Sequence, residues 1–406
     1  MALVLVFLQA ISGLLLLFQY SPEMSKAYDS IRVIQNQVIF GKLIRNLHHW
    51  GANFLIIIVF LHMLRVFFTG AYGGLRNVNW WIGLGLFLCV VISNFTGYLL
   101  PFDQLSYWAI TISIGMFDYI PLVGPHIREM IIGGPDVNQS TLSNFYAAHI
   151  ALIPILLTIL LPFHFWRVRK AGGVVLPFKT DKNSEGRTNK VPTDPFLITR
   201  EVSAALLITA LLLLVSVLFN APLTGSANTG MSPNPAKAPW YFSGLQELLQ
   251  HFHPTFAVFV IPLFLSVLIV LLPYIKQSHD TDGIWFISAK GRKTGLISAV
   301  CALILVPFII IISENIFQPS LVFPGFPLII TDGLIPFLCL LAFIAGLYVY
   351  VNKYQTASRT ETVQAVSIFI LVSFVVLTIV GYWFRGQGMA LCWPWDMTMS
   401  EIALTK

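Results

Sequence analysis

The sequence predicts an all-α integral membrane protein of about nine transmembrane helices, with an amino-terminal four-helix bundle followed by carboxy-terminal helices. Two observations predict this fold class. Of the 406 residues, 56% are hydrophobic and only 10% are charged, whereas a soluble domain carries about 25% charged residues. The chain also contains repeated apolar runs of about 20 residues, the length that crosses a bilayer. Because backbone groups in lipid need internal hydrogen bonds, each run should be helical.

Nine such runs follow one another, at 3–20, 50–69, 79–100, 147–166, 202–220, 256–275, 294–313, 334–351 and 363–384. The first has no charged segment ahead of it, which argues against a cleaved signal peptide. Lysine and arginine concentrate in the loop 167–200, and such loops are usually cytoplasmic. If the spans alternate in direction, the outward loops are those at 21–45, 101–141, 221–253 and 314–333.

The polar stretch after the fourth run divides the chain. We expect an amino-terminal domain over residues 1–170, an inner-side polar linker over 171–195 and a carboxy-terminal domain over 196–406. The net charge of +6 lies in loops without an aromatic and basic stripe, so nucleic acid is not an expected partner. The four cysteines form neither CxxC nor CxxCH, which excludes a zinc knuckle and an ordinary covalent haem site.

Two pairs of histidines lie inside apolar runs. His48 and His62 are fourteen residues apart in the second run, and His149 and His164 are fifteen apart in the fourth. At 3.6 residues per turn these separations are about 3.9 and about 4.2 turns, so each pair shares one broad helix face at two depths. Because both runs cross in the same direction, His48 should match His149 in depth, and His62 should match His164. A porphyrin held axially by one imidazole from each helix needs this arrangement.

Other interpretations of these histidines fit less well. A single intramembrane histidine often bridges helices by a hydrogen bond, but four in two matched pairs argue against that explanation. A zinc or two-metal site would need carboxylates, and these runs contain almost none. His49 faces about 100° away from His48, so it is not a second ligand. The loop histidines, expected to be solvated or capping side chains, are His126, His251, His253 and His279.

Cations and glycines accompany the histidine pairs. Arg45 precedes His48 by three residues and Arg65 follows His62 by three, where a guanidinium could meet a haem propionate or simply extend to the membrane surface. A glycine lets a flat ring approach the backbone or lets helices pack closely. The glycines placed for either role are Gly13, Gly51, Gly83 and Gly97.

Several longer motifs resemble cytochrome b, the quinol-oxidising core of bc-type complexes, which contain a Rieske protein. They occur in the family's order and read "FGKLIRNLHHWGAN", "LHMLRVFFTGAY", "TGYLLPFDQLSYWA", "IPLVGPHIREMIIGG" and "QSTLSNFYAAHIALIPILL". The resemblance is close over the first 170 residues and looser beyond them, where the chain looks like the bacterial fused form. The fifteen-residue histidine spacing is similar to that of the chloroplast and Gram-positive branch.

The resemblance implies a set of cofactor and substrate residues. His48 and His149 would ligate an outer haem b, and His62 and His164 an inner one. Arg45 and Arg65 would lie near propionates, and Arg169 near the inner haem and a quinone site. The loop 101–135 would form an outer quinol pocket together with Gly115, Trp240 and Tyr241. A further covalent haem in some relatives uses a cysteine whose position falls before Met1.

One departure from the family concerns proton transfer. Many members have Pro-Glu-Trp-Tyr, whereas this chain has Pro239 in place of the glutamate. Proline cannot accept a proton, so Glu247 and Asp103 are the nearest catalytic candidates, each of which would have to lie within hydrogen-bonding reach of the quinol. The alternative for each is an ordinary interfacial carboxylate.

The function implied by the resemblance is that of a cytochrome b subunit. It would oxidise quinol outside, send one electron to a Rieske iron–sulfur protein and the other across two haems to an inner quinone site, and move protons. A cytochrome c-type subunit, a homodimer and the bacterial cytoplasmic membrane are also implied. The alternatives are a dihaem anchor of another quinone-linked oxidoreductase, which usually has four or five spans, and a transporter, which would need intramembrane carboxylates and broken helices.

Overall fold

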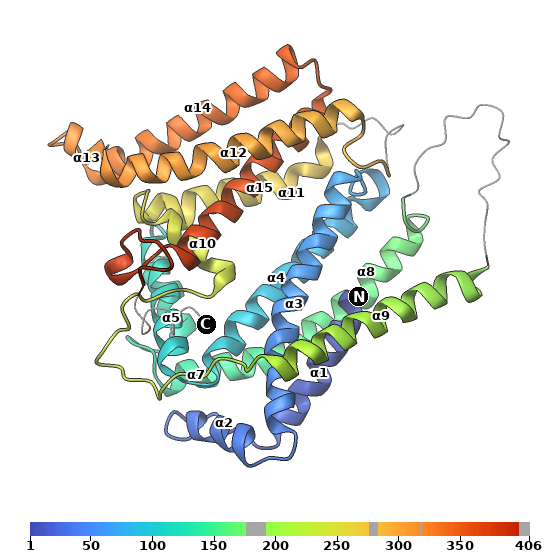
Figure 1. Ribbon diagram of the computed structural model, residues 1–406, viewed down its shortest axis with the longest axis vertical. Helices are drawn as coiled ribbons and strands as arrows, with labels where there is room; N and C mark the ends of the chain where they lie inside the picture. Colours follow the sequence, from blue (N-terminus) through green and yellow to red (C-terminus); the bar gives the residue numbers. More distant parts are fainter. Residues whose placement is uncertain (176–191, 276–282, 317–318, 398–406) are drawn as a thin grey trace. The chain divides into compact units, whose positions relative to one another are not determined.

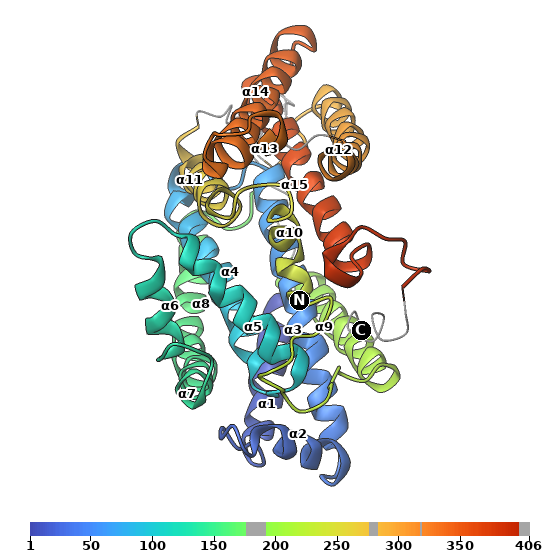
Figure 2. The ribbon, with the colours of Figure 1, turned by 90° about the vertical axis from the view of Figure 1, so that its left-hand side faces the viewer.

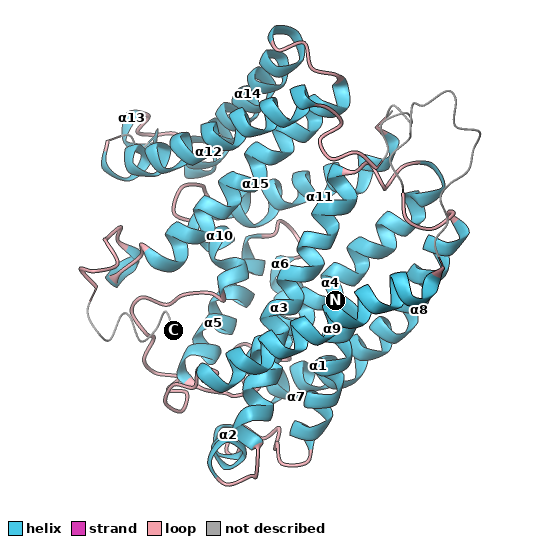
Figure 3. Cartoon of the chain, turned by 45° about the vertical axis from the view of Figure 1, so that its right-hand side comes forward, coloured by secondary structure: helices cyan, strands magenta, loops and turns pink. Residues whose placement is uncertain are grey.

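The computed structural model describes residues 1–175, 192–275, 283–316 and 319–397, and these residues form helices and connecting loops (Figures 1 and 3). Most of the predicted linker and His279 lie outside the described residues. Contacts divide the chain into two compact units, and each is described separately. The first contains residues 1–67, 78–106 and 138–226, and the second contains 68–77, 107–137 and 227–406.

The first unit contains the helices that carry the paired histidines. His48 and His62 lie on α3, and His149 and His164 lie on one continuous helix that runs from α7 through η3 into α8. The elements of this unit are α1 (Ala2–Leu17), α2 (Ala27–Asn36), α3 (Gly41–Phe68), α4 (Asn77–Leu99), α7 (Gln139–Ala147), η3 (Ala148–Leu152), α8 (Ile153–Lys170) and α9 (Thr193–Leu218). Residues 192–226, with α9, also belong to this unit.

The second unit contains the helix formed by the "PWYF" run. This helix, α10 (Trp240–Leu248), packs on α15 (Arg359–Trp383), which also packs along α12 (Ala289–Asn315) (Figures 1 and 2). The other elements are most of α5 (Gln104–Gly115), η1 (Gly74–Arg76), η2 (Met116–Tyr119), α6 (Gly124–Ile132), η4 (Phe256–Val260), α11 (Ile261–Leu271), η5 (Leu272–Tyr274), α13 (Pro319–Val322), η7 (Ile329–Leu334), α14 (Ile335–Val349), η8 (Tyr350–Tyr354) and η9 (Gln387–Met389).

The predicted apolar runs form long helices. Among the described residues eight helices are long and apolar enough to cross a bilayer, and they correspond to the second to ninth predicted runs. The first run also forms a helix, α1, but with 16 residues it is shorter than the predicted span. Many leucine, isoleucine and phenylalanine side chains on these helices are exposed. This apolar surface is what a multi-pass membrane protein presents to lipid.

Three helices contain a wide π turn just before a proline. The turns are η3, η4 and η7, and each is followed by isoleucine and then proline, at Pro154, Pro262 and Pro336. Proline lacks an amide hydrogen, and its ring clashes with the carbonyl four residues back. In each case the preceding isoleucine donates its amide to the carbonyl five residues back, which is the hydrogen bond of a π turn. The Leu-Ile-Pro and Val-Ile-Pro runs therefore account for these turns.

Buried polar contacts hold the histidine helix α3 in its unit. The Asn46 side-chain amide donates to the Ser216 carbonyl at 2.9 Å, and its oxygen accepts the Ala221 amide at 2.8 Å. The Arg45 guanidinium donates to the Ala221 carbonyl at 2.9 Å and to Gln35 at 2.9 Å. These bonds attach the start of α3 to the end of α9. They fix the rotation of α3 about its own axis and therefore the direction in which its histidines point.

Candidate functional site

The four intramembrane histidines lie in two facing pairs within the first unit. The ring centres of His48 and His149 are 6.1 Å apart, with an angle of 78° between the ring planes. Those of His62 and His164 are 6.4 Å apart, with an angle of 79°. Each pair joins one histidine from α3 to one from the α7–α8 helix. The predicted partners in depth are therefore the partners that the fold brings together.

The spacing within each pair suits one metal ion between the rings. An imidazole nitrogen binds a metal at about 2.0–2.1 Å and lies about 1.1 Å from the centre of its own ring, so two imidazoles on opposite sides of one ion have ring centres about 6.3 Å apart. The two observed separations, 6.1 and 6.4 Å, bracket this value. Two imidazoles in direct hydrogen-bonded contact would have their ring centres closer together. The pairs therefore fit axial ligation of an iron by one histidine on each side.

Hydrogen bonds orient the rings of the first pair for ligation. His149 Nδ1 lies 2.9 Å from the Ser93 carbonyl oxygen, which can only accept, so Nδ1 carries the hydrogen. His48 Nδ1 lies 3.0 Å from the Ser12 hydroxyl. A neutral imidazole with its hydrogen on Nδ1 has a lone pair on Nε2, the atom that binds a metal. Such contacts are the usual outer partners of ligating histidines.

Glycines leave room beside three of the four rings. A Cβ atom on Gly97 would lie 2.5 Å from His149 Cε1, and one on Gly13 would lie 3.1 Å from His48 Cε1. The corresponding distance from Gly83 to His164 Cε1 is 3.5 Å. Gly51 instead admits the Gln9 side chain, since a Cβ there would lie 2.1 Å from Gln9 Nε2. The glycines thus let the histidine rings, and one amide next to them, approach a neighbouring backbone.

The π turn η3 explains the unequal histidine spacing. His149 lies inside this turn, and a π turn contains one residue more than an α turn for the same advance along the helix. Fifteen residues from His149 to His164 therefore cover about the distance that fourteen residues cover on α3, roughly 21 Å. The 3.6-residue period assumes a regular α-helix and therefore did not predict this π turn. The signal was Pro154, which lies five residues after His149.

The three predicted cationic residues lie in different surroundings. Arg45 is buried and bonded to backbone carbonyls at 221 and 222 as well as to Gln35. Arg65 is half-buried in the last turn of α3, and Arg169 is exposed in the last turn of α8. Arg45 thus has a structural role in addition to any contact with a propionate.

The outer-pocket candidates Tyr241 and Gly115 lie in the second unit. The Tyr241 hydroxyl is buried and has no hydrogen-bond partner among the described residues. Burial raises the pKa of the Tyr241 hydroxyl, so it stays protonated and able to donate. A Cβ on Gly115 would meet no atom within 4 Å. The π turn η4 contacts both α10, which carries Trp240 and Tyr241, and η2, which follows Gly115 directly.

Asp103 caps a helix and joins two segments of the first unit. Its carboxylate accepts the Ser106 amide at 2.9 Å, together with the Thr224 amide at 2.7 Å and the Thr224 hydroxyl at 2.8 Å. Both oxygens are therefore occupied by donors from the protein, an arrangement that favours a structural role.

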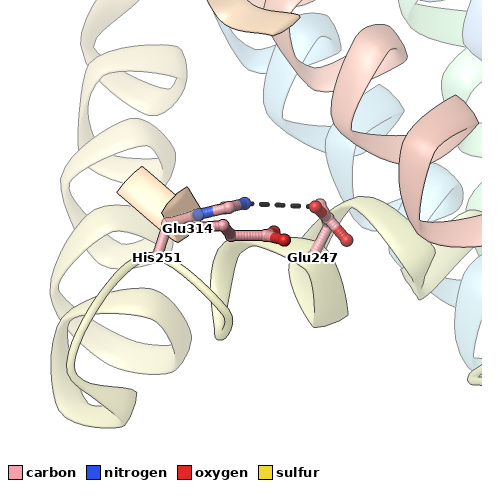
Figure 4. Close-up of side chains that lie close together, drawn as sticks. All are labelled: Glu247, His251 and Glu314. Atoms are coloured by element: carbon pink, nitrogen blue, oxygen red, sulfur yellow. Dashed lines mark hydrogen bonds and ion pairs between the residues drawn. The ribbon is translucent and has the colours of Figure 1, made fainter. Parts of the chain in front are cut away.

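Glu247 belongs to a buried ionic cluster that sequence analysis did not find (Figure 4). The cluster consists of Glu247, His251, Glu314 and Arg385. The Arg385 guanidinium forms ion pairs with both carboxylates, including Nε to Glu247 Oε2 at 2.9 Å. His251 Nε2 lies 3.1 Å from Glu247 Oε1, and its Nδ1 lies 2.9 Å from the Ser313 hydroxyl.

Burial and charge together define this cluster. Side-chain exposure is 0% for Glu247, 1% for Arg385, 8% for His251 and 23% for Glu314. Burial alone would raise the pKa of the Glu247 carboxyl, but the bonds from His251 and Arg385 outweigh it and lower that pKa. His251 was expected to be a solvated or capping side chain, but it is buried in the cluster. His253 Nδ1 accepts the Thr255 amide at 3.3 Å, as a capping side chain does.

A multi-pass helical chain with two facing imidazole pairs at two depths has the features of a haem-binding membrane electron-transfer protein. The family profile described as Cytochrome b/b6/petB matches residues 1–172. The menaquinol:cytochrome c reductase cytochrome b subunit of Geobacillus thermodenitrificans is 39% identical over 166 residues, which are 41% of this chain and 74% of that protein. Cytochrome b6 of Heliomicrobium gestii is 42% identical over 164 residues, which are 40% of this chain and 77% of that protein.

The chain belongs to the cytochrome b family. A solved chain of a hyperthermophilic respiratory complex III has the same fold, with a TM-score of 0.67 over 94% of this chain and 90% of that chain at 24% sequence identity. Sequence relationship thus covers the histidine-bearing part, and likeness of fold extends to the carboxy-terminal helices. Family membership implies haem b, which the two histidine pairs fit by their spacing and their orientation.

Proposed function

We propose that this chain is the cytochrome b subunit of a quinol-oxidising complex in the bacterial cytoplasmic membrane. The observation that carries the proposal is the pair of iron-sized imidazole sites at two depths of one helical unit. His48 and His149 would hold one haem b, and His62 and His164 the other. Haem supplies a one-electron carrier at each site. The four histidines hold these carriers at separate depths, so that an electron can cross the membrane.

The proposed reaction divides the two electrons of quinol. One passes to a Rieske iron–sulfur protein and then to a cytochrome c-type subunit, and the other crosses the two haem sites to a quinone on the inner side, near Arg169. Protons are released outside and taken up inside. The relatives from Geobacillus thermodenitrificans and Bacillus subtilis are named menaquinol:cytochrome c reductase subunits, so menaquinol is the first substrate to test. The working assembly is a homodimer of the complex.

The outer quinol pocket is assigned to the surroundings of Gly115, Trp240 and Tyr241. A buried hydroxyl without a protein partner is rare, and the protonated Tyr241 hydroxyl could donate to a quinol or quinone oxygen. The open space at Gly115 would give the flat ring room to bind. This pocket distinguishes the proposal from a dihaem anchor with one inner quinone site.

Gly115→Ala tests this pocket. The added methyl meets no protein atom, so folding and haem content should be unchanged, while a ligand in that space would be crowded by about 1–3 kcal/mol. The KM for menaquinol in the assembled complex should rise about tenfold, since 1.4 kcal/mol corresponds to a factor of ten. Gly346→Ala, which also meets no atom within 4 Å, is the matched control. An unchanged KM in Gly115→Ala would remove Gly115 from the pocket.

The proton acceptor at the outer site is assigned to the cluster around Glu247. Two carboxylates and one guanidinium give the cluster one excess negative charge, so it can accept one proton without becoming positive. Buried ionisable groups in membrane proteins usually serve a function, and the cluster extends from the buried Glu247 to the partly exposed Glu314. We therefore favour it over Asp103, because the donors to the Asp103 carboxylate are two backbone amides and a hydroxyl and include no second ionisable group.

Glu247→Gln tests the proton route. Loss of a general base typically slows a reaction by about 10²–10⁴-fold, so menaquinol oxidation should fall by at least about tenfold while both haems are retained. Glu314→Gln, at the partly exposed end of the cluster, should slow it less. Exposed Glu129→Gln is the control. Full activity in both cluster variants would show that the proton leaves by another route.

A further inference from the structure

The two histidine pairs differ in the hydrogen bonds made by their Nδ1 atoms. In the first pair, His48 Nδ1 lies 3.0 Å from the Ser12 hydroxyl, and His149 Nδ1 lies 3.3 Å from the Thr96 hydroxyl in addition to its bond with the Ser93 carbonyl. In the second pair, His164 Nδ1 is buried without a partner among the described residues. The described residues likewise form no hydrogen bond with the His62 ring.

Both hydroxyls must accept from the imidazoles rather than donate to them. The Ser12 hydroxyl donates its hydrogen to the Leu8 carbonyl at 2.6 Å, and the Thr96 hydroxyl donates to the Ile92 carbonyl at 2.8 Å. A hydroxyl has one hydrogen, so the remaining contact of each oxygen is with an imidazole N–H group. The two Nδ1–H groups of the first pair therefore face three acceptors, which are the two hydroxyl oxygens and the Ser93 carbonyl oxygen.

Hydrogen-bond donation changes the ligand. When an imidazole donates its second N–H group, the nitrogen bound to the metal becomes more basic. A more basic ligand stabilises the more highly charged oxidised iron and so lowers its reduction potential, because hydrogen bonding around the ligands is one of the means by which a protein tunes haem. The histidines of the second pair have no such acceptors, so their metal-binding nitrogens are less basic and are weaker ligands for iron.

We propose that Ser12 and Thr96 are positioning residues that lower the reduction potential of the haem at His48 and His149 relative to that at His62 and His164. The inference rests on the proposed function, since it requires haem at both sites. The resulting difference in potential directs the electron: when it moves from the first site to the second, the first iron is oxidised and the second is reduced. Net electron flow toward the inner side is then favourable.

A repeat within α4 shows how the second site lacks the hydroxyl. Ser12 and Thr96 each directly precede a glycine that faces a histidine, namely Gly13 and Gly97. Fourteen residues before Gly97, Gly83 faces His164 in the same way, but the residue before it is Ile82. Ile82 occupies the position in this repeat that corresponds to Thr96. Its side chain has no oxygen that could accept a hydrogen bond from His164.

Potentiometric titration of the purified complex, followed by visible absorption of each haem, tests the inference. In the Ser12→Ala/Thr96→Val double variant the lower midpoint potential should rise while the upper stays unchanged. In Ile82→Thr the upper potential should fall while the lower stays unchanged. Thr158→Val is the matched control, because Thr158 lies on the histidine-bearing helix α8 and, among the described residues, its hydroxyl bonds only the Pro154 carbonyl, so the substitution should shift neither potential.

The outcomes separate the inference from the function on which it rests. If the double variant loses the haem at His48 and His149, the potential measured in Ile82→Thr alone decides the inference. This substitution adds a hydrogen-bond acceptor and removes none. Unchanged potentials in the variants that keep both haems, or equal shifts at both haems, would overturn the inference and leave the proposed function standing. Wild-type protein without haem would overturn both.

Discussion

Replacing His149 with alanine should reduce the haem content from two haems per chain to one. The ring of His149 faces that of His48 across a distance that suits one metal ion, and the second pair has two histidines of its own. Because the pairs lie at separate depths, the second site should keep its haem and its reduced-minus-oxidised spectrum. Haem extraction and the visible spectrum of the purified variant provide the measurement.

His164→Ala should remove the other haem, so the two variants should lose complementary parts of the wild-type spectrum. His126→Ala is the control, because His126 is exposed on α6 and lies outside both pairs. Loss of the same spectral component in both variants, or retention of both haems in His149→Ala, would show that the pairing is wrong.

Arg385→Met should destabilise the protein by about 3–5 kcal/mol, the effect expected when one partner of a buried ion pair is removed. Arg385 is 1% exposed, and its loss would leave the fully buried Glu247 carboxylate without its guanidinium. The same substitution would release the end of α15 from α10 and α12. The midpoint of thermal unfolding in detergent should therefore drop markedly.

The pH dependence of this effect has a defined sign. The Glu247 pKa is lowered in the folded protein, so the ion pair stabilises the fold above the unfolded pKa of about 4.3 and loses this effect as the pH falls. The wild type and Arg385→Met should thus differ most near neutral pH and converge in acid. Lys26→Met, which breaks an exposed pair with Glu23, should change stability by less than about 1 kcal/mol. A comparable loss in both variants would argue against a buried cluster.

Local composition was enough to predict the helices and the histidine pairs. Each apolar run had only one way to satisfy its backbone in lipid, and hydropathy therefore located eight spans. The 3.6-residue period placed His48 and His62 on one face without any knowledge of the neighbouring helices. The π turns η3, η4 and η7 were missed because a regular period was assumed, although each of these three precedes an Ile-Pro pair that could have indicated it.

The ionic cluster could not be predicted in the same way. Glu247 and His251 are four residues apart, which was visible, but Glu314 and Arg385 join them from positions 67 and 138 residues beyond Glu247. Only the packing of α10 and α12 on α15 brings these charges together. The roles of Arg45 and Asp103 depend likewise on the segment 221–224, far away in the sequence.

The most direct test of the two-site account is the haem stoichiometry of the purified wild-type chain in its complex. Pyridine haemochrome analysis after acid extraction should give two non-covalent b haems for each chain, one for each histidine pair. One extractable haem per chain, or none, would contradict the account.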